Sequence, residues 1–189
     1  MGFYVSTLRN IPSGKFNHYI YVVDCSGDSI HTSWINENFN RVSQGLGNRA
    51  GIIHGPSDLS LEVLNFLNNQ LEDDFFEIEH LLHSATCLII TDNVLAQSQN
   101  DVFIIPLTSD RSEDDQIHEY MNHIIDTIIE AISSGKFRKY LNTNAAVKFK
   151  IRGKGKILIN SINSILELKP NIAGIGININ VLIEKIFKL

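Results

Sequence analysis

The stretch AGIIHGPSDLSLEVLNFL (residues 50–67) contains a complete strand–turn–helix unit. Ala50–Ile53 is a short apolar run of the kind that forms a buried strand. Gly55 and Pro56 end this run, and Ser57 is a favoured residue at the N-cap of a helix. The apolar positions that follow have the spacing of one helix face: Leu59, Val63, Leu64 and Leu67. A buried strand that leads into an amphipathic helix favours an α/β fold.

The same alternation of strands and helices continues on both sides of this unit. On its N-terminal side we predict two strands and a helix with the bounds Gly2–Leu8, Asn17–Val23 and Ser33–Gln44. On its C-terminal side we predict a helical segment, two strands and a long amphipathic helix with the bounds Glu72–Ser84, Cys87–Ile90, Val102–Ile105 and Ser112–Ser134. Such alternation is typical of a parallel sheet that is covered on both faces. We therefore expect a three-layer α/β fold with a mixed, mostly parallel sheet and helices on both faces.

The charge of the chain changes sign towards the C-terminus. Residues 1–130 contain nineteen acidic and five basic side chains, a net charge of −14, whereas residues 131–189 contain eleven basic and two acidic ones, a net charge of +9. We expect residues 1–134 to form an acidic α/β core and residues 135–189 to form a basic C-terminal edge extension of the same domain. In this extension we predict a strand, a helix, a strand and a helix at Val147–Arg152, Ile157–Leu168, Ile172–Ile177 and Asn180–Phe187.

Length and composition predict a single globular domain. The chain has 189 residues, of which 43% are hydrophobic and 20% are charged, and both fractions are ordinary for a folded protein. Cys25 and Cys87 lack the spacing of a disulfide scaffold, so we expect both to be reduced. The N-terminal residues lack the pattern of a signal peptide, and residues 172–189 contain too many polar side chains for a membrane span. We therefore expect a cytoplasmic protein with no membrane partner, and the abundance of Ile and Asn suggests a microbial source.

Five cations alternate along the predicted strand near residue 150 and beyond it: Lys148, Lys150, Arg152, Lys154 and Lys156. Alternate side chains of a strand share one face, so these cations would form one row. Three interpretations stay open. The row protects an edge strand against aggregation, or it binds the phosphates of nucleic acid or of a small phosphorylated ligand. In the third interpretation it pairs with an acidic surface on a protein partner or on a second copy of the chain.

A second candidate site lies where the predicted strands end. Ligands of open α/β sheets bind beyond the carboxyl ends of the strands. Polar residues that follow three of the predicted strands are expected to form one ligand rim: Asp24, Ser26, His54, Ser57, Asp92 and Asn93. At the start of a helix, Ser57 would bring backbone N–H groups close to a phosphate. The alternative is that these are ordinary polar loop residues.

The sequence Gly-Asp-Ser-Ile at residues 27–30 resembles the signature of the GDSL hydrolases, and Asp115 and His118 match the spacing of that family's Asp-x-x-His pair. The resemblance, which covers these eight residues, implies that Ser29 is a nucleophile. The alternative is structural: Ser29 belongs to a turn, and Asp115 caps a helix. The histidines do not combine with other residues into a metal-binding motif, so we predict no metal site and no cofactor.

The charge division favours a non-catalytic function. We expect an interaction or assembly subunit of a microbial multi-protein system, such as a defence system, whose acidic and basic parts bind a protein partner or copies of the chain. The first alternative is a domain that binds a nucleotide or another phosphoanion at the strand ends, with or without hydrolysis. The second alternative is nucleic-acid binding through the row from Lys148 to Lys156. No residue is assigned a catalytic role at this point.

Overall fold

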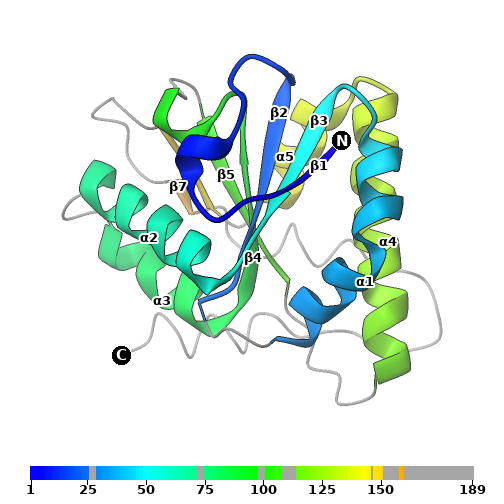
Figure 1. Cartoon of the computed structure of the whole chain (residues 1–189), viewed down its shortest axis with the longest axis horizontal. Coiled ribbons are helices and arrows are strands. Elements are labelled where there is room, and N and C mark those ends of the chain that lie inside the picture. Colours follow the sequence, from blue (N-terminus) through cyan, green and yellow to red (C-terminus); the bar gives the residue numbers. More distant parts are fainter. Residues whose placement is uncertain are drawn as a thin grey trace.

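A single mixed sheet lies between two layers of helices in the computed structural model (Figure 1). The structure describes residues 1–25, 29–71, 75–97, 101–107, 114–145, 147–150 and 158–159. Within these residues the sheet has seven strands in the order β1-β3-β2-β4-β5-β6-β7. The strands are Gly2–Tyr4 (β1), His18–Val23 (β2), Ala50–His54 (β3), Thr86–Thr91 (β4), Asp101–Leu107 (β5), Val147–Lys150 (β6) and Leu158–Ile159 (β7). The helices are Leu8–Asn10 (η1), Ile30–Leu46 (α1), Ser57–Leu71 (α2), Phe76–Ser84 (α3), Leu95–Gln97 (η3), Asp114–Ser133 (α4) and Phe137–Asn144 (α5).

The sheet separates two apolar cores, one under each helical layer. On one face, α1, α4 and α5 pack against the strands through side chains that include Trp34, Ile125 and Phe137. On the other face, α2 and α3 pack through side chains that include Leu67 and Ile78. Figure 1 shows α1 and α4 at the right of the sheet and α2 and α3 at its left. The predicted three-layer α/β architecture with a mixed sheet and helices on both faces is therefore confirmed.

Parallel pairing is confined to one half of the sheet. β3 pairs in parallel with both β1 and β2, whereas the pairs β2–β4, β4–β5, β5–β6 and β6–β7 are antiparallel. As a result β1, β2, β3, β5 and β7 run in one direction, while β4 and β6 run in the other. Most strands of this mixed sheet therefore run in one direction, as predicted, while the hydrogen-bonded pairs beyond β2 are antiparallel. The reversal at β4 decides which loops meet at each edge.

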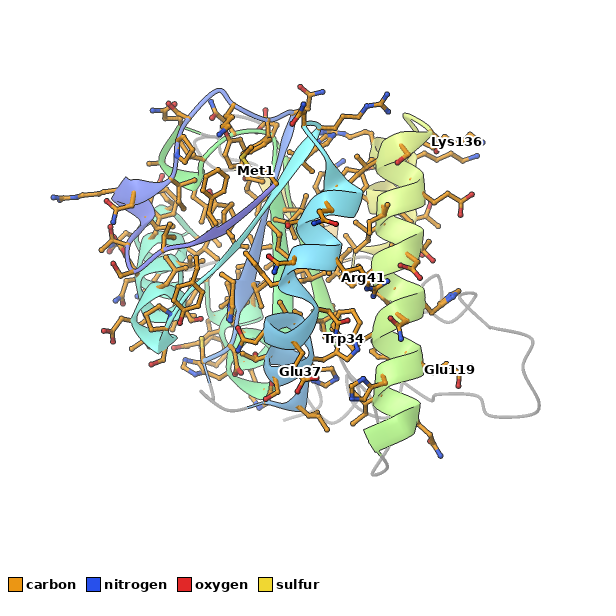
Figure 2. The ribbon with its side chains drawn as sticks, turned by 45° about the vertical axis from the view of Figure 1, so that its right-hand side comes forward. Met1, Trp34, Glu37, Arg41, Glu119 and Lys136 are labelled. Atoms are coloured by element: carbon orange, nitrogen blue, oxygen red, sulfur yellow. The ribbon has the colours of Figure 1, made fainter. Side chains whose placement is uncertain are left out.

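Polar contacts connect α1 to α4 at the surface of their layer. Arg41 on α1 forms an ion pair with Asp126, at 2.9 Å, and donates a hydrogen bond to the Oδ1 atom of Asn122, at 2.7 Å. Figure 2 shows Arg41 directed from α1 towards α4, with Trp34 nearby on the same helix. Exposed ion pairs of this kind contribute about 0–1 kcal/mol. The apolar contacts beneath them therefore do most to hold the two helices together.

Two elements differ in kind from the prediction. Phe137–Asn144 forms α5, which we did not predict, although Phe137 and Leu141 are buried on one face with helical spacing. Leu158 and Ile159 form β7, where we predicted a helix over Ile157–Leu168. They pair with Lys148 and Val147 of β6, so this tertiary pairing overrides the local helical pattern. The rest of that predicted helix, and the elements predicted at Ile172–Ile177 and Asn180–Phe187, lie outside the described residues.

Candidate functional site at the carboxyl ends of β2 and β3

The chain changes faces between two neighbouring parallel strands. β2 is followed by α1, which covers one face of the sheet, whereas the adjacent β3 is followed by α2, which covers the other. The two connections therefore leave the carboxyl edge in opposite directions and create a topological switch point. Ligands of open α/β sheets bind at such points. This edge is therefore the first place to look for a functional site.

Three polar side chains at this edge share the face of the sheet that α1 covers. Val22 and Ile52 belong to the core under α1, and side chains alternate along a strand. Asp24 and His54, each two residues further along, therefore lie on the same side. Thr86 begins β4 and lies two residues before Leu88, which also belongs to the core under α1. The ends of three adjacent strands thus bring an acid, an imidazole and a hydroxyl under the start of α1.

The Asp24 carboxylate binds the first turn of α1. Its Oδ2 atom accepts hydrogen bonds from the backbone N–H of Ser29, at 3.1 Å, and from the hydroxyl of Thr32, at 2.7 Å. The backbone N–H of Asp24 donates to the Oγ atom of Ser60 on α2, at 3.0 Å. A negative charge is favourable at a helix N-terminus. Asp24, which is 5% exposed, therefore fixes the start of α1 to β2 and to α2.

Ser29 acts as the N-cap of α1. Its Oγ atom accepts a hydrogen bond from the backbone N–H of Thr32, at 3.1 Å, and forms a second hydrogen bond with the Oγ1 atom of Thr86, at 2.5 Å. The cap explains why α1 begins at Ile30 and not at Ser33, where we predicted it. His118, which also belongs to the GDSL resemblance, is exposed on α4. Ser29 therefore has a structural role, but as the N-cap of α1 and not as the turn residue that we predicted.

Two histidines at this edge have buried nitrogen atoms without hydrogen-bond partners among the described residues. His54 is 4% exposed and its Nδ1 atom lacks a partner, and the Nε2 atom of His31 in the first turn of α1 lacks one too. The rings of Tyr4 and Tyr120 pack edge-on against His54 and His31. A buried polar atom that lacks a partner costs roughly 1–3 kcal/mol. Two such atoms near one carboxylate make this edge the candidate functional site.

The surroundings of both imidazoles favour the neutral form. Burial lowers the pKa of His54 and of His31, and the Asp24 carboxylate opposes this effect in each case by raising the pKa. Because burial is the larger cause, the net pKa of each imidazole stays below its usual value. A neutral imidazole has one nitrogen that donates and one that accepts, whereas its protonated form donates from both. The site can therefore change its hydrogen-bonding character when it gains a proton.

The two thiols near this edge are poor nucleophiles. Cys25 follows Asp24 and is half-buried, whereas Cys87 in β4 is fully buried. Burial raises the pKa of both thiols, and the Asp24 carboxylate raises each pKa further. The thiolate is the reactive form of cysteine, and a raised pKa suppresses it. Cysteine-based catalysis therefore has no support at this site.

The structure brings together part of the predicted ligand rim and separates the rest. Asp24 and His54 lie at the same edge, and Ser57 is exposed at the first residue of α2, whereas Ser26 lies outside the described residues. Asp92 and Asn93 follow β4, which is antiparallel to β2, so they lie at the opposite edge of the sheet. The prediction that they share one rim with Asp24 is therefore wrong.

The basic row also differs from its prediction where the structure describes it. β6 pairs with β5 on one side and β7 on the other, so the interpretation of β6 as an edge strand is wrong. Lys148 is 25% exposed, forms an ion pair with the buried Asp101, at 3.0 Å, and donates to Asn142. Arg138 of α5 binds the same carboxylate. The structure describes the backbone of Lys150 but not its side chain, and Arg152, Lys154 and Lys156 lie outside the described residues.

Sequence reasoning missed four residues of the site: His31, Thr32, Ser60 and Thr86. His31 and Thr32 were missed because the helix was predicted to begin three residues too late. Thr86 was missed because β4 was expected to run parallel to β2, which would place its first residue at the opposite edge. Ser60 lies in α2 and appeared to be an ordinary helix residue. The usable signal was Ser29, a favoured N-cap residue that lies three residues before Thr32.

Two kinds of feature are absent from the described part of the chain. No group of three or more His, Cys, Asp or Glu side chains there is arranged to hold a metal ion. Among the same residues, no helix combines the length and the apolar character that are needed to cross a membrane. No protein-family model matches the chain, and neither a curated protein nor a solved structure shows significant similarity to it.

Proposed function

We propose that the protein binds a small phosphorylated ligand, such as a nucleotide, at the carboxyl ends of β2 and β3. One observation carries this proposal: at a topological switch point, the buried Nδ1 atom of His54 has no hydrogen-bond partner among the described residues. A ligand oxygen at this position would satisfy it, as a ligand satisfies the open polar groups of many binding sites. His31, whose buried Nε2 atom also lacks a partner among the described residues, supplies the second contact.

The architecture of the edge favours an anion over a neutral ligand. α1 and α2 both begin here, and each presents the positive end of its backbone dipole to the edge. Asp24 already compensates this field at α1 through its bonds to Ser29 and Thr32, whereas α2 begins at the exposed Ser57. We therefore assign the phosphoryl group to this edge, at the Nδ1 atom of His54. Asp24 is a positioning residue because it holds α1, and with it His31, in place.

Partner binding through the basic segment is the second candidate function. It is favoured by the exposed cations Lys136 and Lys139 on the turn before α5 and on α5 itself. This surface would bind an acidic protein or a second copy of the chain. Arg138 and Lys148 add less to it, because both pair with the carboxylate of Asp101. The first candidate takes precedence because its key atoms are buried and lack partners, whereas exposed cations are fully satisfied by water.

A His54→Phe variant should lose ligand binding without losing its fold. The substitution keeps a ring of similar shape and removes a buried polar atom, so the free energy of unfolding should stay the same or rise. The measurement is the melting temperature with inorganic phosphate, AMP, ADP and ATP. In the wild type, a ligand at 100 times its Kd should add about 2.7 kcal/mol to stability, and the variant should show little of this shift.

His18→Phe is the matched control. His18 lies at the start of β2, at the opposite edge of the sheet, and packs edge-on against the ring of Phe137. Like His54, it is a partly buried imidazole whose pKa burial lowers. Its variant should keep the full ligand-induced shift. The proposal fails if none of the four ligands stabilises the wild type, or if the variants of His54 and His18 respond alike.

A further inference from the structure

The charge of the empty site limits how it can accept an anion. The only carboxylate among the described residues of this edge that acts on the two imidazoles is Asp24. Its negative charge already meets the N-terminus of α1 through Ser29 and Thr32. A phosphoryl group would bring further negative charge into a partly buried region, which is costly unless a positive charge accompanies it. Neither of the two imidazoles carries that charge in the empty site.

His54 is best placed to supply this charge. The ring of Tyr4 on β1 packs against the imidazole of His54, with 5.7 Å between the ring centroids. Asp24, at the end of β2, acts on it electrostatically, and burial lowers the pKa of His31 on α1 as well. Gly55 and Pro56 lead from His54 into α2, whose first turn contains the exposed Asp58. Among the described residues, Asp24 is thus the charged group that acts on His54, and no cation does, so protonation would relieve unbalanced negative charge once an anion is present.

We infer that ligand binding at this site is coupled to the uptake of one proton by His54, so that the site binds a fully charged oxyanion and binds it more tightly as the pH falls. This inference rests on the proposed function and adds that ligand binding is regulated by pH. The Nδ1 atom that lacks a partner becomes a charged donor when the imidazole is protonated. A charge-assisted hydrogen bond to an anionic oxygen is shorter and stronger than a neutral one. Without such an anion, burial outweighs the effect of Asp24 and lowers the pKa of His54.

The direction of the pH dependence follows from this linkage. In the empty protein the pKa of His54 is lowered, whereas an anion at Nδ1 would raise it. Between these two pKa values the complex binds one proton more than the empty protein. As the pH rises through this window, the Kd should therefore increase by up to about tenfold per pH unit. At pH values above and below the window, the Kd should stay constant.

Sulfate is a suitable probe because its charge does not change near neutral pH, whereas phosphate titrates there itself. The Kd of sulfate is measured between pH 5.5 and pH 8 at constant ionic strength with chloride, from amide chemical shifts of ¹⁵N-labelled protein. Imidazole ¹⁵N shifts of His54 report its protonation directly. We expect tighter binding at low pH and an imidazolium at His54 when sulfate is bound at a pH at which the empty protein holds it neutral.

Two variants make the result specific to His54. His18→Phe should keep the pH dependence of the Kd, whereas His54→Phe should bind sulfate weakly and with the same Kd at every pH. A Kd of the wild type that does not change with pH, with sulfate bound at this edge, would overturn the inference and leave the proposed function standing. Absence of binding by sulfate, phosphate and nucleotides at every pH would overturn both. A pH dependence that persists in His54→Phe would show that another group takes up the proton.

Discussion

Replacement of Gly55 by Ala should destabilise the protein strongly. A Cβ atom at this position would lie 2.0 Å from the backbone carbonyl oxygen of Val5 and 2.9 Å from a methyl carbon of Leu59. The oxygen cannot move away easily, because the adjacent N–H of Val5 donates a hydrogen bond to the carbonyl of His54, at 2.9 Å. Overpacking typically costs about 1–3 kcal/mol, and we expect a value at or above the upper end because the opposing atom belongs to the backbone.

Gly45→Ala provides the comparison for Gly55→Ala. Gly45 lies within α1, and its Cβ atom would meet the Cδ1 atom of Ile129, at 2.5 Å. This atom is the end of a side chain that can rotate, and Ala gains roughly 1 kcal/mol of helix propensity over Gly. Chemical denaturation should show a small change for Gly45→Ala and a large loss for Gly55→Ala. Equal losses would mean that the backbone contact near His54 is not the cause.

Asp101→Ala should produce the second large effect on stability. The Asp101 side chain is 8% exposed and forms ion pairs with Arg138 of α5 and Lys148 of β6. Both cations also lie over the ring of Phe103. Without the carboxylate, two positive charges would face each other beside a buried ring. Breaking a buried pair costs about 3–5 kcal/mol, and because Arg138 and Lys148 are partly exposed we expect about 2–3 kcal/mol.

Asp126→Ala is the matched control for Asp101→Ala. Asp126 also pairs with an arginine, Arg41, but its side chain is 60% exposed. An exposed pair contributes about 0–1 kcal/mol, so the loss should be small. The two variants are compared by their free energies of unfolding in urea. If Asp126→Ala costs as much as Asp101→Ala, the ion pairs of Asp101 do not anchor α5 and β6 to the sheet as described.

The parts of the fold that followed from the sequence were those with strong local patterns. α4 was predicted within two residues of its observed bounds, because its apolar positions repeat with helical spacing over twenty residues. The direction of β5 relative to β4 was not anticipated. Nine residues separate Thr91 from Asp101, which is fewer than a parallel crossover requires, so the spacing itself already favoured an antiparallel pair.

The same error in strand direction led to a wrong grouping of the candidate site residues. Asp24 and His54 were grouped correctly because β2 and β3 are parallel neighbours. Asp92 was grouped with them only on the assumption that β4 runs in the same direction. Thr86 was missed for the complementary reason, since an antiparallel strand brings its first residue to the edge at which its neighbour ends. The polar residues of a site can be found from sequence, but their grouping depends on strand direction, which long-range pairing decides.

Ion pairs among the described residues explain part of the charge division along the chain. Arg138 and Lys148 of the basic segment bind Asp101 of the acidic part, so opposite charges meet inside the chain. Some of the basic residues therefore fasten α5 and β6 to the sheet and do not serve an external partner. The binding site proposed at the other edge uses neutral histidines, which a count of charged residues does not reveal.

The most direct test of the central claim is the amide ¹H–¹⁵N spectrum of the protein during titration with ATP. The account predicts that the largest chemical shift changes occur where β2 meets α1 and β3 meets α2, at residues such as Asp24, Thr32 and Gly55. Residues of the basic segment, such as Arg138 and Lys148, should change little. Changes centred on Arg138 and Lys148, with none at His54 and its neighbours, would contradict a ligand site at the ends of β2 and β3.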